Sequence, residues 1–179
     1  MVIIKQGDPP HTSDSNTKFE FTGNYQEISG KRVWQIKRKT QGGDGALGGY
    51  IEKEENLDFK GMSWIGPEAK VYGNAKITGD ASIYGNAIIG DEALVSGNAH
   101  VYGEAWVYGA SVVKEDAQVY GHCIISKNVR ISGAARIFGR SIVSGQTKIK
   151  GTAVIQSGEY LEGTYHEGNF DRINIIKSL

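Results

Sequence analysis

The chain has little of what marks several common protein classes. Its 179 residues include one cysteine, Cys123, so an intramolecular disulfide and a cysteine zinc cluster are both excluded. No apolar run approaches the length of a membrane-spanning helix, and Met1–Lys5 is too short for a signal peptide. Lys plus Arg and Asp plus Glu number 20 each, which is not the basic excess expected of a nucleic-acid or anionic-membrane partner. We therefore expect a cytoplasmic protein that binds neither nucleic acid nor membrane.

Glycine is abundant instead, and it recurs in a six-residue repeat that runs from about Ser63 to Gly163. Seventeen positions at a spacing of six are aliphatic, from Ile65 and Val71 to Ile155 and Leu161. A small residue precedes most of them by two positions, and glycine often follows by two. Positions six apart fall on different faces of an α-helix, whereas positions two apart share one side of a strand. The repeat therefore predicts short strands joined by glycine bends, three of which close a coil of eighteen residues.

The hexads resemble those of hexapeptide-repeat proteins over about 100 of the 179 residues. This resemblance implies an all-β fold, a left-handed parallel β-helix, here of about five to six coils. The segment that leads into the repeat carries Gly48-Gly49-Tyr50 and then Glu54-Glu55-Asn56-Leu57. It resembles the corresponding segment of the YdcK-like group of transferases, which have no firmly assigned reaction, and this second resemblance covers roughly residues 30–165.

Three regions follow from the pattern. Residues 1–60 form an N-terminal cap region, because alternation around Phe19 and Phe21 and again over 32–38, with turn signals between, predicts antiparallel strands. Residues 61–163 form the β-helix, whose open ends need covering. Residues 164–179 are expected to be a C-terminal cap or tail with an apolar face formed by four residues: Phe170, Ile173, Ile175 and Ile176.

Sorting the hexads by eighteen gives three faces, and we call first the one whose inward column begins at Ile65 and Ile83. Residues beside an inward residue point outward. On the first face this produces an aromatic ladder formed by Tyr84, Tyr102, Tyr120 and Phe138. The neighbouring outward column contains polar residues, among them His100 and Arg136. The ladder is either local ring stacking or a contact surface. In the second case Tyr84, His100, Tyr102, Tyr120 and Arg136 are the expected ligand-binding residues.

The second face has its inward column at Val71, Ile89, Val107 and onward. Outside it runs a stripe of four apolar residues: Ile88, Trp106, Ile124 and Ile142. Simple β-propensity is one explanation of the stripe. We prefer an interface in a homo-oligomer, because exposed apolar patches usually mark interaction sites, and the hexapeptide resemblance favours a trimer. The third face is mostly polar and is expected to be solvated.

Catalytic signals are weak. Hexapeptide acyltransferases commonly use a histidine as general base, and the resemblance makes His100 the candidate here. His122 stands at a corner where other hexads have Asn, Asp or Glu, so we interpret it as a turn residue. The two histidines fall at different places around the coil, so we expect no metal site within one subunit, although an intersubunit zinc site stays open. Cys123 lies in the small-residue column and is expected to be a buried, inert thiol.

Two functional hypotheses result. The first is a non-catalytic hexapeptide β-helix that self-assembles and binds a partner or small ligand at its aromatic face or at a subunit cleft, without a cofactor. The second is a CoA-dependent acyltransferase with acetyl-CoA as substrate. The uninterrupted coil and the missing catalytic signature favour the first.

Overall fold

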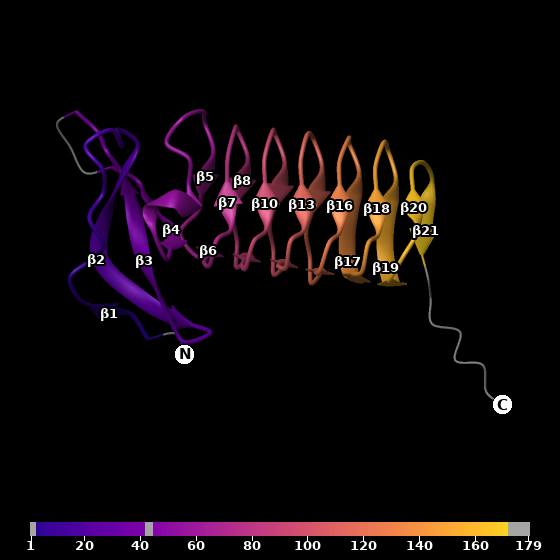
Figure 1. Cartoon of the computed structure of the whole chain (residues 1–179), viewed down its shortest axis with the longest axis horizontal. Coiled ribbons are helices and arrows are strands. Elements are labelled where there is room, and N and C mark those ends of the chain that lie inside the picture. The colour runs from indigo at the N-terminus through magenta and orange to yellow at the C-terminus, as the bar shows by residue number, and fades with distance from the viewer. Residues whose placement is uncertain (1–2, 42–44, 172–179) are drawn as a thin grey trace.

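The computed structural model describes residues 3–41 and 45–171. The chain is all-β and winds into a parallel solenoid of the left-handed β-helix kind with about seven turns, which confirms the predicted fold class (Figure 1). The first face is built by β5 (Trp64–Ile65), β8 (Ser82–Ile83), β11 (His100–Val101), β14 (Gln118–Val119), the start of β17 (Arg136–Val143), the start of β19 (Val154–Tyr160) and β21 (Asn169–Asp171).

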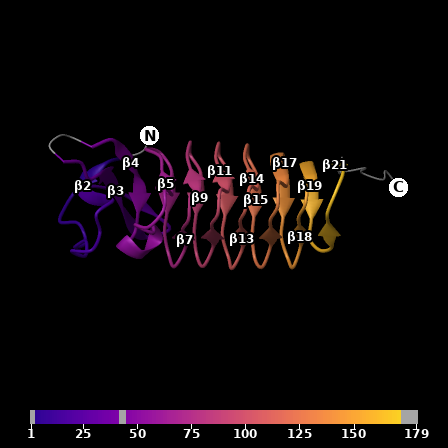
Figure 2. The ribbon, with the colours of Figure 1, turned by 90° about the horizontal axis from the view of Figure 1, so that it is seen from above.

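The other two faces repeat the same arrangement. The second face consists of β4 (Leu47–Ile51), β6 (Lys70–Val71), β9 (Ile88–Ile89), β12 (Trp106–Val107), β15 (Ile124–Ile125) and the ends of β17 and β19. The third face consists of β7 (Lys76–Ile77), β10 (Leu94–Val95), β13 (Val112–Val113), β16 (Arg130–Ile131), β18 (Lys148–Ile149) and β20 (Thr164–Tyr165). Seen from above, successive turns lie side by side along one axis (Figure 2).

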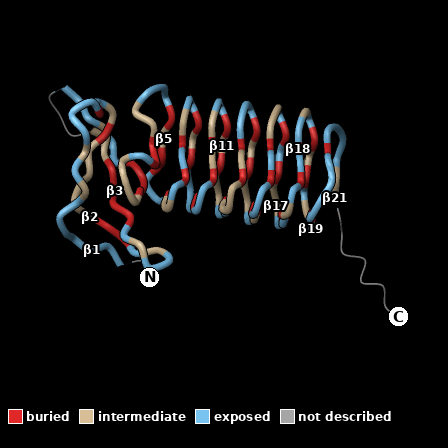
Figure 3. Tube along the Cα trace, in the orientation of Figure 1, coloured by how far each residue is buried: buried red, intermediate tan, exposed pale blue. Residues whose placement is uncertain are grey.

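The core is the inside of this coil. The aliphatic and small columns are buried from Ile65 to Ile155, and the buried segments form bands along the tube at each turn (Figure 3). Backbone N–H groups bond to carbonyls of the next turn, as in Ser82 to Ala99 and His100 to Ala117. Apolar burial and these bonds act at the same positions, so the hexad specifies both the interior and the pairing between turns.

The solenoid is longer than the predicted five to six coils, because segments outside the hexads add turns at both ends. Ile51 pairs with Val71 and Leu57 bridges to Ile77, so each lies twenty residues before its partner instead of eighteen. At the other end β20 and β21 continue the third and first faces. Strict counting by six could not find turns whose loops have other lengths.

The prediction that Leu161 points inward is wrong. Tyr160 is fully buried in its place, whereas Leu161 is 53% exposed. The cause is a register shift in the last turns. Ile137 pairs with Ile155, eighteen residues on, but Arg140 pairs with Ser157, only seventeen residues on.

Antiparallel strands cover the N-terminal end, as predicted. β1 (Lys5–Gln6) pairs with β2 (Phe19–Ile28), β2 pairs with β3 (Lys31–Arg38), and β3 pairs with β4, which then joins the solenoid in parallel with β6. Phe19 and Ile36 are fully buried and belong to the same core as the coil interior. The cap strands therefore form one sheet with the first and second faces of the solenoid, while the third face is a separate sheet, and the cap shares the core of the coil.

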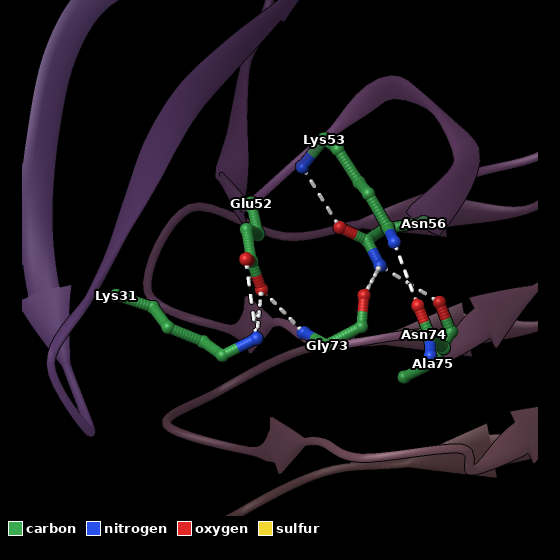
Figure 4. Close-up of polar contacts among 7 residues, drawn as sticks. All are labelled: Lys31, Glu52, Lys53, Asn56, Gly73, Asn74 and Ala75. Carbon is green, nitrogen blue, oxygen red and sulfur yellow. Dashed lines mark hydrogen bonds and ion pairs between the residues drawn. The ribbon is translucent and has the colours of Figure 1, made fainter.

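A polar clamp joins the cap to the first turn (Figure 4). The Glu52 carboxylate accepts a hydrogen bond of 2.6 Å from the Gly73 N–H and a contact of 3.0 Å from Lys31 Nζ. Lys53 Nζ donates to Asn74 Oδ1 at 2.7 Å. Residues from β3, from the segment after β4 and from the first turn of the hexad repeat thus meet at one corner.

Asn56 is the buried centre of this clamp. It ends the 3-10 helix η1 (Glu54–Asn56) and is 0% exposed. Its Nδ2 donates to the carbonyls of Gly73 and Ala75 at 3.1 and 2.8 Å, and its Oδ1 accepts the Lys53 N–H at 2.9 Å (Figure 4). At this corner the Asn56 side chain forms the hydrogen bonds to backbone N–H and carbonyl groups that a neighbouring strand forms elsewhere in the coil.

Aromatic side chains pack together at the C-terminal end of the coil. Phe170 packs edge-on against Tyr165, which packs edge-on against Tyr160. Of the four apolar tail residues that were predicted, Ile173, Ile175 and Ile176 lie outside the described residues. In the described residues no helix is long and apolar enough to cross a membrane.

Candidate functional site

The first face carries a stacked aromatic ladder. Ring centroids are 4.7 Å apart for Tyr84 and Tyr102, 4.7 Å for Tyr102 and Tyr120, and 5.1 Å for Tyr120 and Phe138, with interplanar angles of 7° or less. Eighteen-residue spacing places these side chains on successive parallel strands, so the coil pitch sets the ring spacing. Burial raises the pKa of Tyr84 and of Tyr102, and the rings beside Tyr102 raise its pKa further.

The ladder ends at glycine. Gly66 occupies the ladder position one turn before Tyr84, and a Cβ there would lie 3.2 Å from Tyr84 Cβ. Tyr84 is 41% exposed, the one ladder member among the exposed large apolar side chains of the described residues. Trp64, two residues before Gly66, is covered on one side by the Arg38 guanidinium at 4.0 Å. One face of the Tyr84 ring thus borders the ladder position of Gly66, which has no side chain, and we call this position the empty rung.

His100 lies beside this end of the ladder. Its ring meets Tyr84 edge-on at 6.3 Å, and Nδ1 is buried without a hydrogen-bond partner among the described residues. Arg136 is exposed two turns away in the same outward column, since His100, Gln118 and Arg136 are in register. The structure therefore brings Tyr84, His100, Tyr102, Tyr120 and Arg136 to one face.

A histidine–carboxylate pair lies on the corner between the first and second faces. His122 Nε2 is 3.0 Å from Glu104 Oε2, and both side chains are more than half exposed. The sequence interpretation of His122 as a turn residue placed it at this corner without naming its partner. The signal was available, because positions 104 and 122 are eighteen apart and so lie on adjacent turns.

The second face carries the apolar stripe in unbroken register. Ile88, Trp106, Ile124 and Ile142 pair in sequence on neighbouring parallel strands. Trp106 is 50% exposed and Ile142 is 40% exposed, while Ile88 and Ile124 are half-buried. All four predicted interface residues lie together in one row on the surface of the single chain.

A groove lies at the cap end of this stripe. It has a volume of about 420 Å³ and lies between the N-terminal segment, the end of β2 and the solenoid, with Ile3, Ile28, Lys70 and Ile88 among its lining residues. Burial lowers the pKa of Lys70, whose Nζ donates to the Glu68 carbonyl. The stripe thus continues into a recess that is part apolar and part charged.

The remaining candidates for chemistry are unpromising. Cys123 is fully buried, its Sγ contacts the Tyr120 carbonyl, and burial raises the pKa of the thiol to about 11, which disfavours the thiolate. Within 3–41 and 45–171, no group of three His, Cys, Asp or Glu side chains is placed to hold a metal ion. No family model matches the chain, and no curated protein matches it in sequence.

Proposed function

We propose that this protein is a non-catalytic, self-assembling β-helix whose second face is a subunit interface. One observation carries the proposal, namely the row formed by Ile88, Trp106, Ile124 and Ile142 on the outside of the coil. A tryptophan that is half exposed in the middle of three isoleucines is a poor surface for water. Membership of the hexapeptide-repeat proteins, with a YdcK-like lead-in, and cytoplasmic residence belong to the same proposal.

The third face is the internal comparison. Its outward positions in the equivalent column are mixed: Lys76, Arg130 and Lys148 are charged and exposed, whereas Leu94 and Val112 are apolar and half-buried. On the turns of Ile124 and Ile142 the third face therefore carries charged residues, Arg130 and Lys148, at the equivalent position. Only the second face is apolar at all four of these positions, so the hexad alone does not require the continuous row.

Replacing Trp106 by serine tests the interface. We expect the unaltered protein to sediment as an oligomer and the Trp106→Ser protein to associate at least about 30-fold more weakly, since buried tryptophans are frequent hot spots. Val112→Ser, in the same column on the third face, is the matched control and should leave association unchanged. Analytical ultracentrifugation over a concentration series measures both. A protein that stays monomeric throughout would contradict the proposal.

We further propose that a flat aromatic ligand stacks on Tyr84, in the empty rung over Gly66. Support comes from the open ring face of Tyr84, the edge-on His100 ring and the nearby Arg38–Trp64 stack. Stacking on an aromatic side chain contributes about 1–3 kcal/mol per base in nucleic-acid complexes. CoA-dependent acyl transfer with His100 as base is the alternative and would place an adenine-bearing substrate on the same face.

Adenosine and acetyl-CoA are the probes for the empty rung. We expect adenosine binding, followed by NMR shifts of the tyrosine rings, to be lost in Gly66→Tyr, which fills the rung with a side chain of the ladder's own type. Phe138→Leu, at the end of the ladder far from Gly66, should leave binding unchanged. Binding that survives Gly66→Tyr would refute the site, and acetyl-CoA turnover that depends on His100 would support the alternative.

A further inference from the structure

The charges beside the apolar stripe change sign at its midpoint. Counting each second-face strand with its two corners, residues 85–92 contain Asp91 and Glu92, and residues 103–110 contain Glu104. Residues 121–128 contain Lys127, and residues 139–146 contain Arg140. These segments contain no other Lys, Arg, Asp or Glu, and all five charged residues are exposed.

The stripe and the charges occupy the same four turns. Ile88 and Trp106 belong to the two acidic turns, and Ile124 and Ile142 belong to the two basic turns. The sign therefore changes between Trp106 and Ile124, the middle of the apolar row. Such a pattern is complementary to itself when it is reversed end to end.

We propose that a second copy of the chain docks on this face in the antiparallel direction, around a twofold axis that crosses the stripe between Trp106 and Ile124. This inference rests on the proposed self-assembly and specifies its geometry. An axis parallel to the strands keeps equivalent corners together and reverses the order of turns. Trp106 then faces Ile124 of the second copy, and Ile88 faces Ile142 of the second copy.

The same operation brings opposite charges together. At one corner Arg140 lies one turn, about 4.8 Å along the solenoid axis, from Glu104 of the second copy. At the opposite corner Lys127 lies one turn along the solenoid axis from Asp91 of the second copy. Long basic side chains span that distance, so each basic residue has an acidic partner within reach, and electrostatic complementarity of this kind fixes orientation and register.

A parallel arrangement lacks this complementarity. Any symmetry axis along the solenoid places turns of equal level together, so the turns of Asp91, Glu92 and Glu104 would collect negative charge. The turns of Lys127 and Arg140 would collect positive charge. Like charges placed together at an interface are unfavourable. The charge pattern thus favours an antiparallel dimer over the trimer that the hexapeptide resemblance suggests.

The ends of the face complete the contact. Four turns at 4.8 Å span only about 19 Å, whereas a standard interface buries about 800 Å² on each partner. In the antiparallel dimer the last turn, where Leu161 is 53% exposed, comes to the level of the groove formed by Ile3, Ile28 and Lys70. The groove extends the apolar stripe and offers a place for this otherwise exposed leucine.

Charge reversal tests the orientation. We expect Glu104→Lys and Arg140→Glu each to weaken association about 10-fold at low salt, because each replaces two attractive contacts by two repulsive ones in a twofold dimer. The double variant Glu104→Lys/Arg140→Glu restores the pair across the interface and should recover association. Within one chain these residues are two turns apart, about 9.6 Å, so recovery reports a contact between copies. Asp116→Lys, at a corner away from the second face, is the charge control.

Sedimentation and one distance measurement separate the outcomes. A spin label on Glu162→Cys, in a Cys123→Ser background, should give a separation of about 24 Å or more along the axis in the antiparallel dimer, since five turn spacings separate its level from its symmetry mate. A monomer would overturn the proposed function itself. A trimer, a short label distance, or a double variant as weak as the single ones would overturn the antiparallel dimer and leave self-assembly standing.

Discussion

Replacing Asn56 by alanine is expected to lower the free energy of unfolding by about 3–5 kcal/mol, because it leaves three buried or part-buried backbone groups without their hydrogen-bond partner. The Lys53 N–H and the carbonyls of Gly73 and Ala75 all bond to the Asn56 amide, which is 0% exposed. Asn56→Asp keeps the volume but sets a carboxylate against two carbonyl oxygens, so we expect it to be at least as damaging. Urea denaturation followed by circular dichroism measures both.

Asn74→Ala is the matched control for this prediction. Asn74 is the same residue type in the same clamp, but it is exposed, and its Oδ1 accepts a single bond from Lys53 Nζ. Its loss should change the unfolding free energy by no more than about 0.5 kcal/mol. If Asn56→Ala and Asn74→Ala proved equally mild, the clamp would not hold the cap to the first turn.

The interior of the solenoid could be predicted from the sequence because one rule repeats. From Ile65 to Ile155 each inward residue must be aliphatic and each turn has the same length, so counting by six found the whole buried column. The rule failed where turn length changes. Ile51 and Leu57 lie twenty residues before their partners, so the hexad column that begins at Ile65 did not include them. Leu161 was assigned the place of Tyr160 because the last turns are shorter.

The contacts between outward residues could be predicted only where the residue type at eighteen-residue spacing is enough to imply the contact. Aromatic rings at eighteen-residue spacing had to stack, and Tyr84, Tyr102 and Tyr120 do so. The Glu104–His122 pair and the reversal of charge along the second face need charges to be counted turn by turn, which a hexad pattern does not do. Whether any of these residues binds a ligand or a second copy remains a prediction.

The two glycines of the lead-in segment have a structural explanation. Gly48 and Gly49 lie in β4, and both are buried. A Cβ on Gly48 would lie 2.7 Å from the Trp64 ring and 2.8 Å from Ile36 Cγ1. Glycine in a strand marks a close approach of other backbone or side-chain atoms. The motif that the sequence resemblance emphasised thus lets the cap strand lie directly on the first turn.

Gly49→Val is therefore expected to be severely destabilising, by about 3 kcal/mol or more, because its Cβ would meet two backbone carbonyl oxygens and the fully buried Ile65 side chain. Its Cβ would meet the Gly66 carbonyl oxygen at a closer distance than any real Cβ contact, the Ala69 carbonyl oxygen at 2.5 Å and Ile65 Cγ2 at 2.6 Å. Leu47→Val changes an exposed residue of the same strand and should cost less than about 0.5 kcal/mol. Denaturant midpoints compare the two. A Gly49→Val protein as stable as Leu47→Val would mean that β4 does not seal the open end of the coil, and the exposed core would then need another cover.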